Sequence, residues 1–178
     1  MALETTESSD RIIFRYITPR DASALRTLRH RAIEECAAQF GTPPEIEFAR
    51  GTDYYRRQLV QGFQKKTKAT LGGWVDGDLV CMAGIRRRRT LEGPVGLITS
   101  MFVEPAWRGR HIGGYLLDQA MKRIKDTWQL SIFQMNVEVN NEKALRLYQR
   151  HGFEILKRQN NAFTINGTPH AVYLLEKK

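Results

Sequence analysis

Two short glycine-containing turns restrict the fold of this chain more than any other feature of its sequence. Asp76-Gly77 and Asn166-Gly167 each stand between two runs that are rich in apolar and β-branched residues. Such dipeptides favour the tight turns of β-hairpins, in which both central residues adopt a positive φ. We therefore expect one hairpin over residues 69–87 and another over 153–175. Strands joined in this way argue against the strict strand–helix alternation of a doubly wound parallel sheet.

Apolar periodicity and turn residues predict the other elements. In chain order we expect a strand at 11–18, a helix from Thr18-Pro19 to Gly41, a helix over most of 45–60, strands at 69–75, 79–87 and 95–103, a helix after a glycine-rich turn at 108–114, a strand at 132–139, a helix at 142–150, and strands at 153–165 and 169–175. This order indicates an α/β (or α+β) fold with a mixed sheet and helices on its faces.

The length of 178 residues suits a single domain, since a second core would leave each half small. Residues 1–10 are polar and acidic and lack the pattern of a signal peptide. We expect them to form a disordered tail and residues 11–178 to form the domain. No apolar run approaches the length of a membrane span, so a cytoplasmic location is the default expectation. Cys36 and Cys81 are too few for a disulfide framework, and we expect both to be buried free thiols.

The charge of the chain favours an anionic partner. Lysine and arginine outnumber aspartate and glutamate by 28 to 19, which gives a formal net charge of +9. Such a balance suits a nucleic acid, a membrane surface or a small molecule that carries phosphate. The run Arg86–Arg89 resembles a nucleic-acid patch, but its place at a strand end suits a solvated loop at least as well. Charge alone therefore leaves the partner open.

A glycine-rich turn follows the strand at 95–103 and opens a helix. Its residues are Arg108, Gly109, Arg110, His111, Ile112, Gly113 and Gly114. The first N–H groups of a helix have no internal partner and carry partial positive charge, so they suit phosphate oxygens. Glycine lets a ligand approach the backbone closely, and the two arginines add positive charge. The turn matches neither the Walker pattern nor the dinucleotide-binding fingerprint, so it predicts an anion site of another kind.

A second cluster lies in the helix at 142–150. Asn141, Ala144 and Tyr148 share one helix face, and seven residues at 1.5 Å separate the first and last by roughly 10 Å. This face is polar at each end and small in the middle, which suits an extended ligand. A helix with an asparagine at its start and a tyrosine at an interface would give the same pattern.

Together the two clusters are recognisable. Residues 101–113, Met-Phe-Val-Glu-Pro-Ala-Trp-Arg-Gly-Arg-His-Ile-Gly, resemble the acetyl-coenzyme A motif of the GNAT N-acetyltransferase superfamily. Asn141, Ala144, Leu147-Tyr148 and Gly152-Phe153 resemble the second motif of that family. The order of elements also matches over residues 11–175. The resemblance implies a GNAT-like fold with a mostly antiparallel central sheet, acetyl-coenzyme A as cosubstrate, and direct transfer of the acetyl group to a primary amine.

The resemblance also implies roles for individual residues. A V-shaped opening would separate the strands at 95–103 and 132–139. A backbone N–H near Val103 would stabilise the developing oxyanion, and Tyr148 would be catalytic, protonating the departing thiolate. The cofactor-binding residues would be Met101, Phe102, Val103, Arg108, Gly109, Arg110, His111, Ile112, Gly113, Gly114, Asn141 and Tyr148.

Two positions depart from the family pattern. His111 stands where the family usually has glycine; it keeps a backbone N–H, but a positive φ there would cost energy. Leu97 stands where many members carry a glutamate, so the base that deprotonates the amine lies elsewhere, acts through water or is dispensable. The possible carboxylates are Glu34, Glu45, Glu47, Asp53 and Glu92. The histidines His30, His111, His151 and His170 lack metal-ligand spacing, so we expect no metal site.

Two rival functions remain at this point. The missing strand glutamate would suit a non-catalytic, coenzyme A-binding regulatory module, and the net charge would suit a nucleic-acid-binding domain. For the enzyme we expect a small-molecule or peptide amine as partner, and neither a membrane nor a nucleic acid. The acceptor and the oligomeric state stay open, a homodimer included.

Overall fold

The computed structural model describes residues 11–178, so the tail expected at 1–10 lies outside the described residues. The strands are β1 (Ile13–Tyr16), β2 (Lys68–Val75), β3 (Asp78–Thr90), β4 (Gly93–Val103), β5 (Ile132–Glu138), β6 (Glu154–Ile165) and β7 (Thr168–Lys177). The helices are α1 (Ala22–Phe40), α2 (Pro44–Phe48), α3 (Thr52–Gln64), α4 (Ile112–Trp128) and α5 (Glu142–Arg150), with 3₁₀ turns at Pro19–Asp21 and Pro105–Trp107. None of the helices in 11–178 has the length and hydrophobicity of a membrane span.

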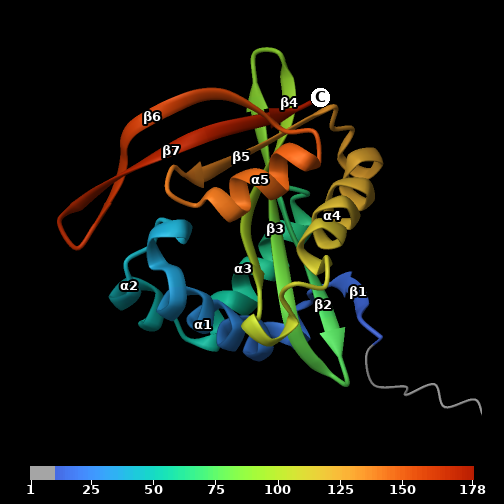
Figure 1. Cartoon of the computed structure of the whole chain (residues 1–178). Helices are drawn as coiled ribbons and strands as arrows, with labels where there is room; N and C mark the ends of the chain where they lie inside the picture. The colour runs from blue at the N-terminus through green and yellow to red at the C-terminus, as the bar shows by residue number, and fades with distance from the viewer. Residues whose placement is uncertain (1–10) are drawn as a thin grey trace, which may run out of the picture.

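The strands form one sheet in the order β1-β2-β3-β4-β5-β7-β6 (Figure 1). β4 and β5 run parallel, and every other neighbouring pair is antiparallel. The expected mixed, mostly antiparallel sheet is confirmed. Both expected hairpins form, and their turn residues have positive φ: 49° and 91° at Asp76 and Gly77, and 51° and 78° at Asn166 and Gly167.

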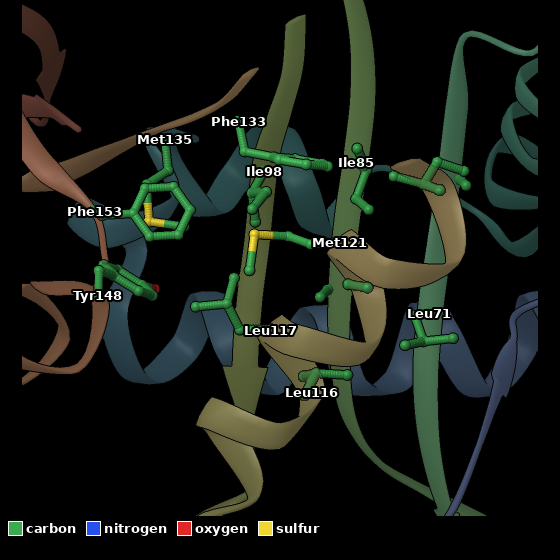
Figure 2. Close-up of a cluster of buried hydrophobic side chains, with 14 of the residues drawn as sticks. Leu71, Ile85, Ile98, Leu116, Leu117, Met121, Phe133, Met135, Tyr148 and Phe153 are labelled. Atoms are coloured by element: carbon green, nitrogen blue, oxygen red, sulfur yellow. The ribbon is translucent and has the colours of Figure 1, made fainter. Parts of the chain in front are cut away.

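Helices cover both faces of the sheet. On one face, α4 and α5 contribute Leu116, Leu117, Met121 and Tyr148 to a cluster of buried side chains that includes Ile98. Figure 2 shows this cluster, with the α4 side chains lying over the strands. On the other face, α1 and α3 build a second cluster around Leu28, Tyr55, Met82 and Phe102. Burying a leucine of this kind contributes about 2 kcal/mol, so α4 is held firmly where its N-terminus meets β4.

The prediction of one helix over 45–60 is wrong, because the chain leaves helical geometry between α2 and α3. Arg50 is fixed at this break from both ends: its carbonyl accepts a hydrogen bond from Arg26 at 3.2 Å, and its guanidinium donates to Glu47 at 2.6 Å. Gly51 follows and has low helix propensity. Across the break, the Tyr55 hydroxyl of α3 donates to the buried Glu47 carboxylate of α2.

Two smaller expectations also need correction. Arg86–Arg89 belong to β3 and pair with residues 94–97 of β4, so they form part of a strand and not a loop. Their side chains are exposed. Cys81 is fully buried, but Cys36 is half-buried. Cys36 stands at an interruption of α1, with φ −153° and ψ 54°, and it lines the groove described next.

Candidate active site

The parallel strands β4 and β5 separate part-way along their length. Residues 95–98 pair with residues 132–135, and no pairing follows. Beyond this point β4 also bulges: its register against β3 shifts by one residue, and Ser100 has a positive φ of 56°. A narrow opening lies there, lined by Ser100, Met101 and Asn136 among others. The V-shaped opening expected from the sequence is therefore present.

At the end of β4, the N–H and C=O groups of one residue point toward this open edge. Glu104 donates its N–H to the carbonyl of Val80 on β3, at 2.9 Å. Backbone groups alternate in direction along an antiparallel ladder, so the N–H and C=O of Val103 point away from β3. The Val103 carbonyl accepts a hydrogen bond from Arg108 Nε at 2.8 Å. Its N–H faces the side from which β5 has diverged.

The N-terminus of α4 supplies further unpaired donors. The N–H of Tyr115 donates to the carbonyl of His111, at 3.2 Å. The N–H groups of Ile112, Gly113 and Gly114 have no partner inside the helix. All three residues line a groove of about 560 Å³, which continues along β4 and along α5 as far as Tyr148.

Backbone strain and close packing shape the turn before α4. His111 is the N-cap residue and adopts a left-handed conformation, φ 59° and ψ 11°. His111 thus has a positive φ, a conformation that glycine would adopt at lower cost. A Cβ atom at Gly114 would lie 2.5 Å from His151 Nε2, so glycine lets α4 and α5 approach. At Gly113 the nearest atom would be Leu147 at 3.5 Å, an ordinary contact on the groove wall.

Helix α5 carries the second set of groups. Asn141 is its N-cap, and its side-chain oxygen accepts a hydrogen bond from the N–H of Ala144 at 3.2 Å. Tyr148 is 8% exposed and packs edge-on against Phe153 (Figure 2). Burial raises the pKa of Tyr148 to about 12. Its hydroxyl makes no hydrogen bond to any residue in 11–178, and Tyr148 lines both the groove and the opening.

Comparison with known proteins identifies the family to which this chain belongs. The sequence profile of the Acetyltransferase (GNAT) family matches residues 29–153. The chain belongs to the GNAT acetyltransferase family. An uncharacterized N-acetyltransferase of Methanocaldococcus jannaschii is 34% identical over 82 residues, which are 46% of this chain and 34% of the relative. The match therefore spans about a third of that curated relative's length.

Solved structures agree on the fold of this GNAT protein. An acetyltransferase of the GNAT family from Streptococcus pneumoniae superposes with a TM-score of 0.80 at 20% identity, over 94% of this chain and 98% of the other. A Salmonella typhimurium protein solved with its cofactor acetyl-CoA gives a TM-score of 0.80 at 16% identity, over 95% and 94%. The expected GNAT-like fold is confirmed.

The structure brings most of the sequence-predicted site residues of this GNAT protein together. Arg110 is the exception: it is not on the groove lining, and its guanidinium stacks on Trp107 at 4.9 Å. Arg108 lines the groove but forms a bidentate ion pair with Glu35 of α1, at 2.6 and 2.9 Å. The loop therefore offers less free positive charge than its two arginines suggest. Asn141 likewise uses its oxygen on its own helix, which leaves its amide NH₂ for a ligand.

Sequence reasoning missed several groups that line the site. Lys143 on α5 and Glu35, Cys36 and Gln39 on α1 line the groove, and Glu138 at the end of β5 lines the opening. Lys143 and Glu138 lie within a few residues of Asn141 in the second motif, so their closeness to the motif in the sequence could have identified them as site residues. The α1 residues had none, because only the folded chain brings that helix beside β4.

The five carboxylates considered as bases are absent from the lining of both the opening and the groove. Only Glu47 is buried, and it is bound by Arg29, Arg50 and Tyr55. Burial alone raises the pKa of Glu47, but the Tyr55 hydrogen bond and the two guanidinium charges outweigh it, so the pKa lies below its ordinary value. A carboxylate of this kind stays ionised and is a poor proton acceptor at neutral pH.

The Glu47 network has a structural role at the opening. Arg29 donates to Glu47 through Nε at 3.0 Å and to the hydroxyl of Ser100 through Nη1 at 2.7 Å. Ser100 is the bulge residue of β4 with positive φ. A buried ion pair thereby connects α2 to the point where β4 leaves its regular path.

The groove fits the extended, phosphate-bearing cosubstrate that the family implies. It combines unpaired helix N–H groups, the lysine Lys143 and an unpaired strand edge along one continuous hollow. These are the partners that phosphate oxygens and amide groups require. Within residues 11–178, no group of three or more His, Cys, Asp or Glu side chains is placed to hold a metal ion.

Proposed function

We propose that this protein transfers the acetyl group of acetyl-coenzyme A directly to a primary amine. The observation that carries the proposal is the continuity of the site. One groove joins the unpaired N–H groups of α4 to the Tyr148 hydroxyl, and Tyr148 also faces the opening between β4 and β5. Acetyl-coenzyme A supplies the activated acyl group as a thioester. The remaining steps belong to the residues of this chain.

Binding divides between the two ends of the groove. The N–H groups of Ile112, Gly113 and Gly114, together with Lys143, hold the phosphates. The free edge of β4 from Met101 to Val103 bonds the amide-containing arm, and the Asn141 NH₂ donates a further hydrogen bond. Lining up thioester and amine in this way converts an encounter into a nearly intramolecular reaction.

Tyr148 and Val103 act on the reacting atoms. The Val103 N–H stabilises negative charge on the thioester oxygen as the amine attacks. Tyr148 keeps its proton at neutral pH because burial raises its pKa to about 12, and it donates that proton to the departing sulfur. The acceptor releases its ammonium proton to water before it attacks, and the second proton that its nitrogen loses returns to the tyrosinate.

Direct transfer is favoured because the thiol beside the groove is poorly suited to carry an acyl group. Cys36 lines the groove, and its pKa is raised to about 11, first by burial and then by the neighbouring charge of Glu35. The thiolate, not the thiol, is the nucleophile, so little of Cys36 is reactive at neutral pH. An acyl-enzyme on this residue is therefore not part of the proposal.

The test follows thiol release from acetyl-coenzyme A in the presence of single amines: arylalkyl amines, polyamines, lysine peptides and peptide N-termini. Thiol release that depends on an amine, with acetylated amine as the second product, is the expected result. Calorimetry supplies the affinity for coenzyme A separately. Affinity without turnover on any amine would contradict the proposal and favour the non-catalytic coenzyme A-binding module.

A further inference from the structure

A second hollow adjoins the opening and is distinct from the coenzyme A groove. It has a volume of about 250 Å³ and is lined by the end of α1, by β4 and β5 near their divergence, and by β6. The end of α1 meets β6 directly: a Cβ atom placed on Gly41 would lie 3.6 Å from the Phe163 ring. The hollow shares only Gln39 with the groove, and the narrow opening lies between them.

The lining of this hollow is uncharged apart from one carboxylate. Glu138 is the one Asp, Glu, Lys or Arg on the lining of the hollow or of the opening. The lining also holds the aromatic rings of Phe40 and Phe163, the aliphatic side chains of Leu97 and Val172, and neutral polar side chains such as Gln39, Asn136 and Gln159. A lone carboxylate among uncharged side chains attracts a cation and disfavours a second anion.

The Glu138 carboxylate is held in place by its own chain. Oε2 accepts a hydrogen bond from the N–H of Asn140 and Oε1 accepts one from its Nδ2, both at 3.0 Å. The side chain is 11% exposed. A carboxylate fixed in this way loses little rotamer freedom when it binds a ligand.

The two basic side chains near the hollow already have partners. Arg29 stacks on Phe40, 4.7 Å from the ring centre, but its N–H groups donate to Glu47 and Ser100. His170 of β7 has its Nδ1 3.8 Å from Glu138 Oε1, and its ring stacks on Phe163 with the ring centres 5.1 Å apart. Neither Arg29 nor His170 lines the hollow.

We infer that Glu138 binds the ammonium group of the acceptor, and that the acceptor is a primary amine with an apolar or aromatic group and no carboxylate. This inference rests on the proposed acetyl transfer and assigns the acceptor of that site. Glu138 lines both the hollow and the opening where Tyr148 stands, so an amine held by it is next to the reaction centre. Its apolar group occupies the wall formed by Phe40 and Phe163.

A carboxylate on the acceptor finds no counter-charge in this hollow. The lining of 14 residues contains no lysine or arginine, so the carboxylate of a free amino acid would be desolvated beside Glu138. An amine whose neighbouring carbonyl is an amide avoids this cost. Arylalkyl amines and the N-termini of peptides share this chemistry.

The experiment compares three amines that differ only beside the ammonium group: phenethylamine, phenylalaninamide and phenylalanine. Their binding is measured by ligand-detected NMR with and without coenzyme A, so the readout does not need turnover. We expect the first two to bind at least tenfold more tightly than phenylalanine. A fourth ligand, the peptide phenylalanyl-alanyl-alaninamide, distinguishes small amines from peptide N-termini as the acceptor. Tighter binding than phenylalaninamide assigns peptide N-termini, and equal or weaker binding assigns small amines; both support the inference.

Two variants locate the effect. Glu138→Gln keeps the size of the side chain and removes its charge. We expect this variant to bind phenethylamine at least tenfold more weakly than the wild type, and to prefer phenethylamine over phenylalanine by less than threefold. Glu154→Gln removes an exposed carboxylate at the start of β6 and should leave both values within twofold. Coenzyme A affinity should stay unchanged in both variants, which shows that they fold.

Three results would overturn the inference: equal binding of phenylalanine and phenylalaninamide, an unchanged phenethylamine affinity in Glu138→Gln, or no measurable binding of phenethylamine and phenylalaninamide to the wild type. Failure of acetyl transfer is detected separately, as absence of thiol release with every amine tested while the amine affinities keep the expected order.

Discussion

The groove proposed for coenzyme A and the hollow proposed for the acceptor lie on either side of one opening, but different kinds of groups line them. The groove relies on main-chain N–H groups of α4 and on the edge of β4, and most of it comes from two motifs. The hollow relies on side chains from α1, β4, β5, β6 and β7, which are distant in sequence. Main-chain recognition needs glycine and fixed spacing, so it leaves a pattern in the sequence. Side-chain recognition across distant elements leaves none.

The largest expected effect is on the acceptor side, where a single ion-pair network supports the bulge. Replacing Glu47 by Gln leaves Arg29 and Arg50 without their buried counter-charge, and we expect the free energy of unfolding to fall by about 3 kcal/mol. Denaturant unfolding measures this value. Glu45→Gln, in the same helix but exposed, is the matched control and should change it by less than about 0.5 kcal/mol.

The same variant gives a pH dependence of known sign. The pKa of Glu47 is lower in the folded state than its ordinary value, so its stabilising contribution is present above that ordinary value and is lost as the pH falls through the folded pKa. The difference between wild type and Glu47→Gln should be largest near pH 7 and shrink below about pH 4. A difference that stays constant with pH would mean that the charge of Glu47 contributes nothing.

The second effect concerns Tyr148, which lines both the groove and the opening. Tyr148→Phe keeps the ring against Phe153 and removes the proton donor, so we expect turnover to fall about 10²-fold, or about 2.7 kcal/mol, with little change in coenzyme A affinity. Tyr115→Phe, an exposed tyrosine of α4, is the control. Turnover of Tyr148→Phe within twofold of wild type, with chemistry rate-limiting, would make Tyr148 a packing residue.

The sequence predicted the local parts of this molecule well and the long-range parts poorly. The bounds of α5 and both hairpin turns were predicted because their signals lie within a few residues of each other. The break after α2 was not, because it depends in part on Arg26 of α1, which is distant in sequence and donates to the carbonyl of Arg50. Glu138 was missed as a site residue although it lies close to the second motif in the sequence, because the hollow that it lines forms only once α1 and β6 meet. Leu97, noted for lacking a carboxylate, lines that same hollow.

A smaller effect tests the charge of the groove. Arg108 is neutralised by Glu35, so Arg108→Ala should weaken coenzyme A binding by at most about tenfold, whereas Glu35→Gln should strengthen it a few-fold by releasing the guanidinium. Isothermal calorimetry at low and high salt measures both. If Glu35→Gln instead weakens binding, the ion pair is needed to shape the groove.

The smallest expected effect is at His111. Glycine removes the cost of the left-handed conformation, about 1 kcal/mol, but loses part of this gain to the greater freedom of the unfolded chain. We expect His111→Gly to be more stable by about 0.5 kcal/mol and to bind coenzyme A within a few-fold of wild type. His111→Ala keeps the strained φ and should show no gain. A loss of affinity beyond tenfold would show that the imidazole itself contacts the cofactor.

The divergence of β4 and β5 also affects how the chain unfolds. The sheet consists of two antiparallel blocks, β1 to β4 and β5 to β7, and between them the ladder is only four residues long on each strand. A ligand in the groove contacts β4 and α4 on one block and α5 on the other, so it acts as a cross-link between them. Hydrogen exchange should therefore slow on both sides of this seam when coenzyme A binds, because the blocks then open together at a higher free energy.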